Sequence, residues 1–273
     1  MNLSESLKNL CNYNLAAFKS VLISEICVKL FFILNFVNFA KNLTNFAVKI
    51  ITQYQYKKMK FKAVLFDLDG TLVNSLIDIA DSINKVLQER NFPTHSYEVI
   101  NDFIGSGLRN LVTKALPETH KDEATIESTF QAMMTNYREN CTNKTIAYDG
   151  IIELLDELKS KNIKLAVLSN KADELTKKIG LTLFPDYFEI VMGLKSEATK
   201  KPNPSAAIEI SKDLGFSAEE VLYVGDSGID MQTAKNANMH AVGVLWGYRP
   251  EEELKAEGAQ SIINHPLELL ELL

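Results

Sequence analysis

The sequence has few cysteines and no long apolar run, and each lack excludes a class of protein. Its 273 residues include three cysteines, at positions 11, 27 and 141, with no CxxC spacing. So few cysteines, odd in number and without that spacing, form neither a disulfide framework nor a zinc site. Their sparseness favours a reducing cytoplasm as the compartment. The longest apolar stretch, residues 30–40, covers eleven residues and includes two asparagines. A membrane-spanning helix needs about 20 apolar residues, so this stretch is too short to span a bilayer.

Basic residues are outnumbered overall, and their distribution divides the chain. The net charge of −6 argues against a nucleic-acid partner, which usually meets a basic face. Residues 1–58 nevertheless carry seven lysines and two glutamates, a balance of +5, which leaves −11 for the remainder. The same 58 residues contain no Gly, Pro, Asp, Arg, His or Trp. A folded unit of that length almost always needs Gly or Pro to turn, so two different kinds of sequence are joined here.

Three interpretations fit residues 1–58. Met59 directly precedes the first apolar strand pattern and reads as a natural start, so the upstream residues could be non-coding sequence translated from a misplaced start codon. They could instead form a peripheral basic amphipathic anchor. A helical interaction arm or an organelle-targeting segment is the third interpretation, although the lack of arginine disfavours targeting. We favour the first, and expect no membrane association unless residues 1–58 are genuinely expressed.

From residue 59 onward, short apolar runs alternate with stretches of helical spacing. Buried strands are predicted over 62–67, 163–168, 188–192, 221–224 and 241–245. Helices are predicted from about residue 171, over 204–214 and over 228–236. Strands that alternate with such helices are typical of an α/β fold, with a doubly wound, mostly parallel sheet and a Rossmann-like core.

The alternation stops between residues 76 and 147, where helical patterns occur without convincing strands. Helices are predicted over 77–90, 96–103 and 108–116. We expect this interval to form a small helical cap inserted after the first strand. The α/β core would then comprise residues 59–75 and 148–273, on both sides of the insertion.

Polar residues follow the predicted strands at their carboxyl ends, which is where open α/β sheets bind ligands. In chain order they are Asp67, Asp69 and Gly70 after the first strand, Ser169 and Asn170 after the second, Lys201 before the 204–214 helix, and Asp226 and Asp230 after the fourth strand. Gly70 would let the chain turn sharply beside a ligand. We expect all of these groups to converge on one edge of the sheet.

These residue types suit the binding and transfer of a phosphate group. Asp67 and Asp69 are two residues apart at a strand end, which places them on one side of the chain. A hard, oxygen-binding cation such as magnesium would collect them with Asp226. The cation would offset the repulsion between an attacking carboxylate and a phosphate dianion, and Lys201 would add a second positive charge. Ser169 and nearby backbone N–H groups could hold phosphate oxygens.

Two of these assignments have a structural alternative. Ser169 and Asn170 could be the N-cap of the helix that follows the second strand. This role is compatible with phosphate binding, since both use a helix N-terminus. Asp230 could likewise only cap or brace its helix.

Four segments resemble the motifs of the haloacid dehalogenase-like superfamily, and within it the phosphoglycolate phosphatase-like group with an inserted helical cap. They are DLDGTLVNS (67–75), LSNK (168–171), KPNP (201–204) and VGDSGIDMQTAKNANM (224–239). The first and last are specific, whereas the middle two are weak alone but fall in the right order and spacing. The resemblance spans about residues 60–273.

The resemblance implies a magnesium-dependent (Mg2+) hydrolase that acts on a small phosphorylated metabolite. Asp67 would be the nucleophile that forms an aspartyl-phosphate, while Asp69 would protonate the leaving oxygen and then activate water. The Asp67 side chain, the Asp69 backbone carbonyl and Asp226 would bind the metal, with Asp230 as a ligand or support. Family members that dehalogenate lack the second acid, so Asp69 favours phosphate chemistry. We expect 2-phosphoglycolate as substrate, and a cytoplasmic monomer or homodimer.

The loop over 103–109 is the predicted substrate-facing segment of the cap. Gly105 and Gly107 could cradle an anion there, and Arg109 could bind a carboxylate bidentately, although a plain turn with a solvated arginine fits equally well.

Three other functions remain open. They are a phosphosugar mutase that uses the same two aspartates, a pyrophosphatase of similar fold, and a non-enzymatic, membrane-associated binding protein that uses residues 1–58.

Overall fold

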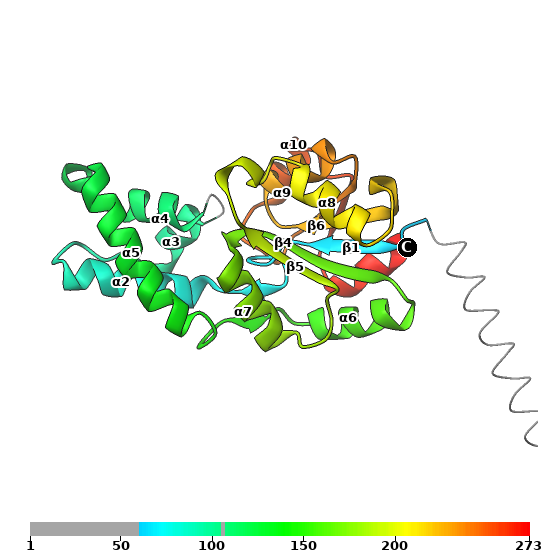
Figure 1. Cartoon of the computed structure of the whole chain (residues 1–273), viewed down its shortest axis with the longest axis horizontal. Helices are drawn as coiled ribbons and strands as arrows, with labels where there is room; N and C mark the ends of the chain where they lie inside the picture. The colour runs from blue at the N-terminus through cyan, green and yellow to red at the C-terminus, as the bar shows by residue number, and fades with distance from the viewer. Residues whose placement is uncertain (1–59, 105–106) are drawn as a thin grey trace, which may run out of the picture. The chain divides into compact units, whose positions relative to one another are not determined.

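A parallel sheet organises the part of the chain that the computed structural model describes, residues 60–104 and 107–273 (Figure 1). Its six strands run in the order β5-β4-β1-β6-β7-β8. They are β1 (Ala63–Phe66), β4 (Lys164–Ala172), β5 (Ile190–Leu194), β6 (Val221–Gly225), β7 (His240–Val244) and β8 (Ser261–Ile263). β1 lies between β4 and β6, and Phe66 is in register with Val167 and Val224. The segments that follow these three strands therefore meet at one edge of the sheet.

Helices cover both faces of the sheet, so the α/β fold predicted from the sequence is confirmed. Figure 1 shows α6 (Ile151–Ser160) and α7 (Asp173–Leu183) on one face, with α8 (Ser205–Asp213), α9 (Gly228–Asn236) and α10 (Glu251–Ala256) on the other. The side chains of β1 alternate between two cores: Val64 and Phe66 join one, while Ala63 and Leu65 join the other. This period of two follows from the pleat of the strand, and it explains why β1 is apolar at every position.

A helical insertion lies between the two strands of a short antiparallel ribbon, β2 (Val73–Asn74) and β3 (Ile146–Ala147). Its helices are α2 (Leu76–Glu89), α3 (Tyr97–Phe103), α4 (Leu108–Ala115) and α5 (Glu123–Asn140). They bury apolar side chains against one another, among them Ile83, Ile100, Leu111 and Met133. Short 3₁₀ helices complete the described chain: η1 (Glu118–His120), η2 (Glu197–Thr199), η3 (Ala218–Glu220) and η4 (Pro266–Leu272).

The five predicted strands are all present, but the second is longer than expected. β4 continues through Ser169, Asn170 and Lys171 to Ala172, and α7 begins at Asp173. The interpretation of Ser169 and Asn170 as a helix N-cap is therefore wrong, because hydrogen bonding to a neighbouring strand extends past them. The short strands β2 and β3, the strand β8 and the helices α5, α6 and α10 were not predicted by range.

Some sequence-based predictions lie outside the described residues. These are every interpretation of residues 1–58 and the role given to Gly105. Within the described part of the chain, no helix is both long enough and apolar enough to cross a membrane.

Candidate active site

The loop after β1 wraps around a carboxylate that comes from another strand. Gly70 has a φ of +89°, in the left-handed region that favours glycine. A Cβ at this position would lie 2.2 Å from Asp226 Oδ2, so only glycine lets the backbone approach so closely. The next residue, Thr71, donates a hydrogen bond from its hydroxyl to Asp226 Oδ1 at 3.3 Å. The DGT sequence thus builds one wall of the site around Asp226.

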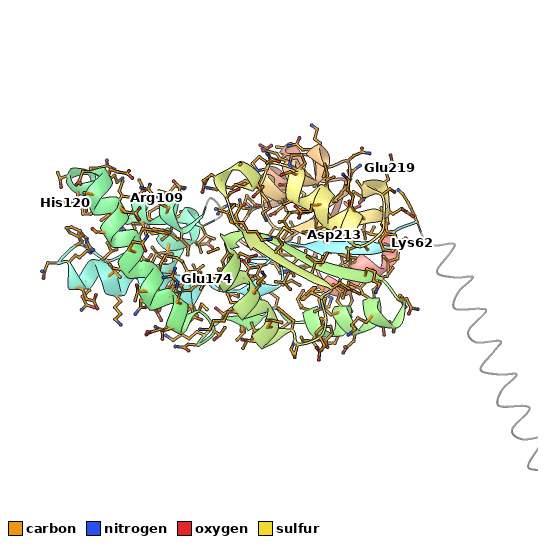
Figure 2. The ribbon with its side chains drawn as sticks, in the orientation of Figure 1. Lys62, Arg109, His120, Glu174, Asp213 and Glu219 are labelled. Carbon is orange, nitrogen blue, oxygen red and sulfur yellow. The ribbon has the colours of Figure 1, made fainter. Side chains whose placement is uncertain are left out.

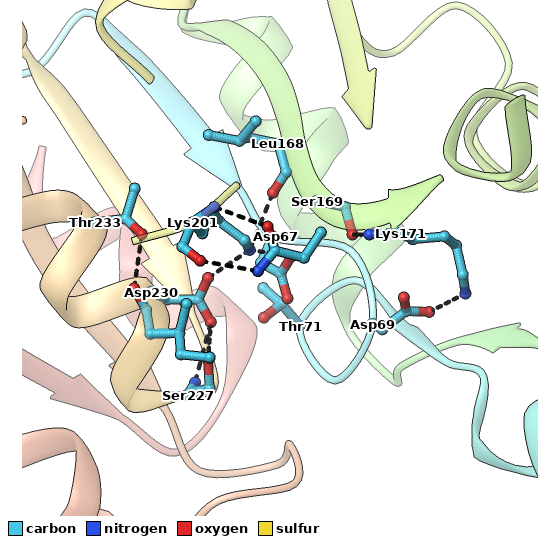
Figure 3. Close-up of polar contacts among 12 residues, drawn as sticks. Asp67, Asp69, Thr71, Leu168, Ser169, Lys171, Lys201, Ser227, Asp230 and Thr233 are labelled. Atoms are coloured by element: carbon cyan, nitrogen blue, oxygen red, sulfur yellow. Dashed lines mark hydrogen bonds and ion pairs between the residues drawn. The ribbon is translucent and has the colours of Figure 1, made fainter. Parts of the chain in front are cut away.

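Lys201 connects two of the predicted carboxylates (Figure 3). Its Nζ lies 2.7 Å from Asp67 Oδ1 and 2.7 Å from Asp230 Oδ1. It also donates to the backbone carbonyl of Leu168 at 3.3 Å. The Lys201 side chain is only 4% exposed, so its charge is compensated by these carboxylates rather than by water.

Asp230 has both of its carboxylate oxygens occupied. Oδ1 accepts the bond from Lys201, while Oδ2 accepts from the backbone N and the hydroxyl of Ser227 at the start of α9. Asp230 therefore braces the start of its helix and also contacts Lys201, so it does more than cap.

Asp67, Asp226 and Asp230 form a buried cluster that could hold a metal ion. One oxygen from each lies within 4.8 Å of the others. The cluster combines three carboxylates with the ammonium of Lys201, which contacts two of them, so carboxylates outnumber the ammonium. Hard oxygen donors in this number are what a divalent cation such as magnesium prefers, and such a cation would balance the charge. The residues present therefore fit the magnesium that the sequence resemblance implies.

Burial and the neighbouring charges shift the pKa values of the cluster. The pKa of Asp67 is raised to about 7, chiefly because burial disfavours its charged form, with Lys201 opposing the shift and Asp230 adding to it. Burial and the charge of Asp67 also raise the pKa of Asp226 well above its usual range. Burial alone would lower the pKa of Lys201, but Asp230 and Asp67 raise it well above the ordinary value.

Asp69 lies in a separate group of contacts, beside this cluster. Its Oδ1 accepts hydrogen bonds from the Ser75 hydroxyl and from Lys171 Nζ, the latter at 2.6 Å. Lys171 also contacts the hydroxyl of Tyr137, on α5, at 2.7 Å. Figure 3 shows the Lys171 ammonium beside the carboxylate of Asp69.

A cavity connects the two groups. Its polar lining includes Asp67, Asp69, Ser169 and Lys201, and the helical insertion contributes the apolar side chains Ile79, Ile104, Leu108 and Leu111. Asn170 also lines the cavity, but its amide is bound to the backbone of Lys201. The predicted polar residues of the sheet edge are therefore brought together.

Arg109 is a predicted substrate-binding residue that does not line the cavity. It pairs with Glu123 and lies 3.6 Å from Glu127, both on α5, and Figure 2 shows it among the helices of the insertion. Arg249, from the loop after β7, lines the cavity instead. Its guanidinium donates to the backbone carbonyl of Ile104 at the end of α3.

Sequence reasoning missed Lys171, Tyr137 and Arg249. Lys171 stands within the LSNK segment, so its position was visible, but no residue nearby in the sequence indicates its partner. Tyr137 is a single tyrosine in a mostly polar helix, and no residue near it in the sequence indicates that it belongs to the site. Arg249 follows a predicted strand at its carboxyl end, which is the one pattern that could have identified it.

Comparison with known proteins gives the same assignment. The family described as haloacid dehalogenase-like hydrolase matches residues 64–244. A phosphoglycolate phosphatase of Aquifex aeolicus is 33% identical over 213 residues, which cover 78% of this chain and 96% of that protein. One from Haemophilus influenzae is 34% identical over 196 residues, covering 69% and 88%.

Solved structures agree with these relatives. The crystal structure of a predicted phosphoglycolate phosphatase from Haemophilus somnus has a TM-score of 0.73 and 30% identity, and covers 79% of this chain and 99% of its own. The sequence motifs, the fold and these similarities all support one assignment. The chain belongs to the haloacid dehalogenase-like hydrolases, as a phosphatase of the phosphoglycolate phosphatase-like group.

Proposed function

We propose that this protein hydrolyses a small phosphomonoester, with magnesium as cofactor and Asp67 as the nucleophile of an aspartyl-phosphate mechanism. The observation that supports this most directly is the buried contact between Asp67 and Lys201. One carboxylate oxygen of Asp67, Oδ1, is bound to Lys201 Nζ at 2.7 Å. The other oxygen can then attack phosphorus, while the ammonium keeps the side chain oriented.

Magnesium would be held by Asp67, Asp226 and the backbone carbonyl of Asp69. When bound, it supplies positive charge against the phosphate oxygens, which lowers the repulsion between two anions. Asp230 fits a supporting role, since its oxygens already accept hydrogen bonds from Lys201 and Ser227.

The remaining residues hold the phosphate and move protons. Ser169 is 3% exposed and lines the cavity, where its hydroxyl can donate to a phosphate oxygen. Lys201 offsets the charge of the transferring phosphoryl group. Asp69 gives a proton to the leaving oxygen and later takes one from the attacking water. Its side chain is 15% exposed, against 9% for that of Asp67, and both carboxylates line the cavity.

We propose 2-phosphoglycolate as the substrate. Its carboxylate requires a second cationic group, and Arg249 lines the described cavity without contacting any of the four aspartates. Guanidinium groups bind carboxylates with directed, charge-assisted hydrogen bonds. Arg249 therefore takes the role that the sequence suggested for Arg109. The phosphoglycolate phosphatases among the relatives support the same substrate. The cytoplasm, where such metabolites are handled, is the proposed location.

A panel of phosphate esters assayed with magnesium tests this function. We expect phosphate release from 2-phosphoglycolate, and its loss in Asp67→Asn, because an amide cannot form the aspartyl-phosphate. Turnover retained by Asp67→Asn would contradict the assignment. β-Glucose 1-phosphate and inorganic pyrophosphate belong in the same panel. Formation of glucose 6-phosphate without free phosphate would indicate a mutase, and preferential cleavage of pyrophosphate would indicate a pyrophosphatase.

A further inference from the structure

Lys171 is a buried lysine for which the proposed reaction has so far no use. Its side chain is 2% exposed, although it lines the cavity. Burying an ammonium costs free energy unless hydrogen bonds and an opposite charge compensate it. The compensation here comes from Asp69 Oδ1 at 2.6 Å and the Tyr137 hydroxyl at 2.7 Å.

The contacts of Asp69 are asymmetric. Ser75 and Lys171 both donate to Oδ1. Within residues 60–104 and 107–273, no donor contacts Oδ2. The carboxylate is thus held at one oxygen, and the other remains available for proton transfer at the cavity. Both donors therefore determine where Oδ2 lies.

We propose that Lys171 is a positioning residue for proton transfer by Asp69, and that Tyr137 of the helical insertion holds Lys171 in place. The proposal rests on the function proposed above. As Asp69 passes its proton from Oδ2 to the leaving oxygen, negative charge develops on its carboxylate. The ammonium beside Oδ1 stabilises that charge, so the contact is stronger in the transition state than before proton transfer.

Tyr137 makes this device depend on the insertion. It lies on α5 and is fully buried, whereas Asp69 follows β1 and Lys171 lies near the end of β4. The contact between Tyr137 on α5 and Lys171 at the sheet edge therefore fixes the position of the ammonium. The ammonium in turn fixes the orientation of the Asp69 carboxylate. The helical insertion contributes to the chemistry of the site as well as to its apolar wall.

Ethyl phosphate and acetyl phosphate test the proposal, because they are similar in size but differ in leaving group. Ethoxide is a strong base and needs a proton as it leaves, whereas acetate leaves as a stable anion. We expect Lys171→Met to lower kcat/KM for ethyl phosphate by about 10²-fold, the size of a general-acid contribution, and for acetyl phosphate by less than about fivefold. Asp69→Asn is the reference and should show the same dependence on the leaving group.

Tyr137→Phe provides a second test that keeps the ring and removes one hydrogen bond. We expect about a tenfold loss with ethyl phosphate and little change with acetyl phosphate, since one such bond contributes about 1.4 kcal/mol. Tyr187→Phe is the matched control, because the Tyr187 hydroxyl contacts Asp156 on the exposed surface. If Lys171→Met proves too unstable to assay, Tyr137→Phe decides with the same two esters.

Two results would overturn the proposal. Equal losses with both esters in Lys171→Met would mean a general structural role, and Tyr137→Phe behaving like Tyr187→Phe would remove Tyr137 from the device. Either result leaves the proposed function intact if Asp67→Asn is inactive. Activity retained by Asp67→Asn would instead contradict the proposed function itself.

Discussion

Asn170 holds the backbone of Lys201 with both ends of its side-chain amide. Its Oδ1 accepts from Lys201 N at 2.9 Å, and its Nδ2 donates to Lys201 O at 3.2 Å. β4 and the loop that carries Lys201 are thereby fixed to each other. Asn170, which was predicted to bind phosphate, thus has a structural role: it fixes the position of the Lys201 backbone, from which the side chain extends to Asp67.

Asn170→Ala should therefore lower activity through Lys201. The variant loses two buried hydrogen bonds, each contributing about 1 kcal/mol, so we expect a loss of about 2 kcal/mol in stability. We also expect about a tenfold fall in kcat, because Lys201 would no longer be held against Asp67. Thermal unfolding and steady-state kinetics measure the two effects.

Asn203→Ala is the control for that prediction. Asn203 lies in the same loop, and its side chain donates to Ala198 O and accepts from Ser205 N on the exposed surface. If Asn170→Ala and Asn203→Ala have the same kcat, the proposed link between Asn170 and Lys201 is wrong.

Gly70→Ala should damage the metal site beyond its effect on the backbone. Gly70 and Gly215 have similar positive φ angles, +89° and +85°, so alanine should cost each about 1 kcal/mol in backbone strain. Of these two glycines, Gly70 is the one at which the new Cβ would meet Asp226, whereas nothing lies within 4 Å of the new Cβ at Gly215. We expect magnesium affinity, from the metal dependence of activity, to fall about 10–100-fold in Gly70→Ala. An unchanged affinity in that variant, as expected for Gly215→Ala, would contradict the assignment of Asp226 as a ligand.

The raised pKa of Asp67 predicts how pH and magnesium act together on stability. Folding raises this pKa from 3.8 to about 7, so the folded, metal-free protein favours the protonated carboxyl. The contribution of the protonated Asp67 carboxyl to the stability of the folded, metal-free protein is complete below about pH 4. It is lost as the pH rises through about 7. Asp226, with its raised pKa, acts in the same direction.

We therefore expect magnesium to raise Tm more at about pH 8 than at about pH 5, because the metal binds the ionised carboxylates and protons compete with it. Thermal melts with and without magnesium at both pH values measure this difference. In Asp67→Asn the difference should shrink. A magnesium-induced shift in Tm that is equal at both pH values would count against a metal bound by these carboxylates.

The sequence was sufficient for the sheet and for the convergence of its carboxylates. The strands are short apolar runs buried on both faces, and the parallel order of β4, β1 and β6 brings the residues after them to one edge. Asp67, Lys201 and Asp226 could therefore be predicted together, although 134 residues separate Asp67 from Lys201.

The contacts made by the insertion could not be predicted in the same way. Lys171 pairs with Asp69 from 102 residues away, and the Tyr137 contact depends on how α5 packs. The local sequence does not show which of Arg109 and Arg249 lines the cavity. In the structure Arg109 pairs with two glutamates on α5. Arg249 instead donates to a backbone carbonyl at the end of α3 and lines the cavity. Such choices depend on helix packing, which apolar periodicity does not determine.

Arg249→Met tests which arginine binds the carboxylate of the substrate. Charge-assisted hydrogen bonds contribute about 1.5–3 kcal/mol, so we expect KM for 2-phosphoglycolate to rise by about 10–100-fold. Ethyl phosphate has a similar size but no carboxylate, and its kinetics should change by less than about threefold. This comparison also controls for the bond that Arg249 donates to Ile104 O, because a displaced α3 would affect both esters. Arg109→Met should leave both substrates unchanged, since Arg109 pairs with Glu123. A rise in KM confined to Arg109→Met would instead identify Arg109, the residue that the sequence first suggested, as the one that binds the carboxylate.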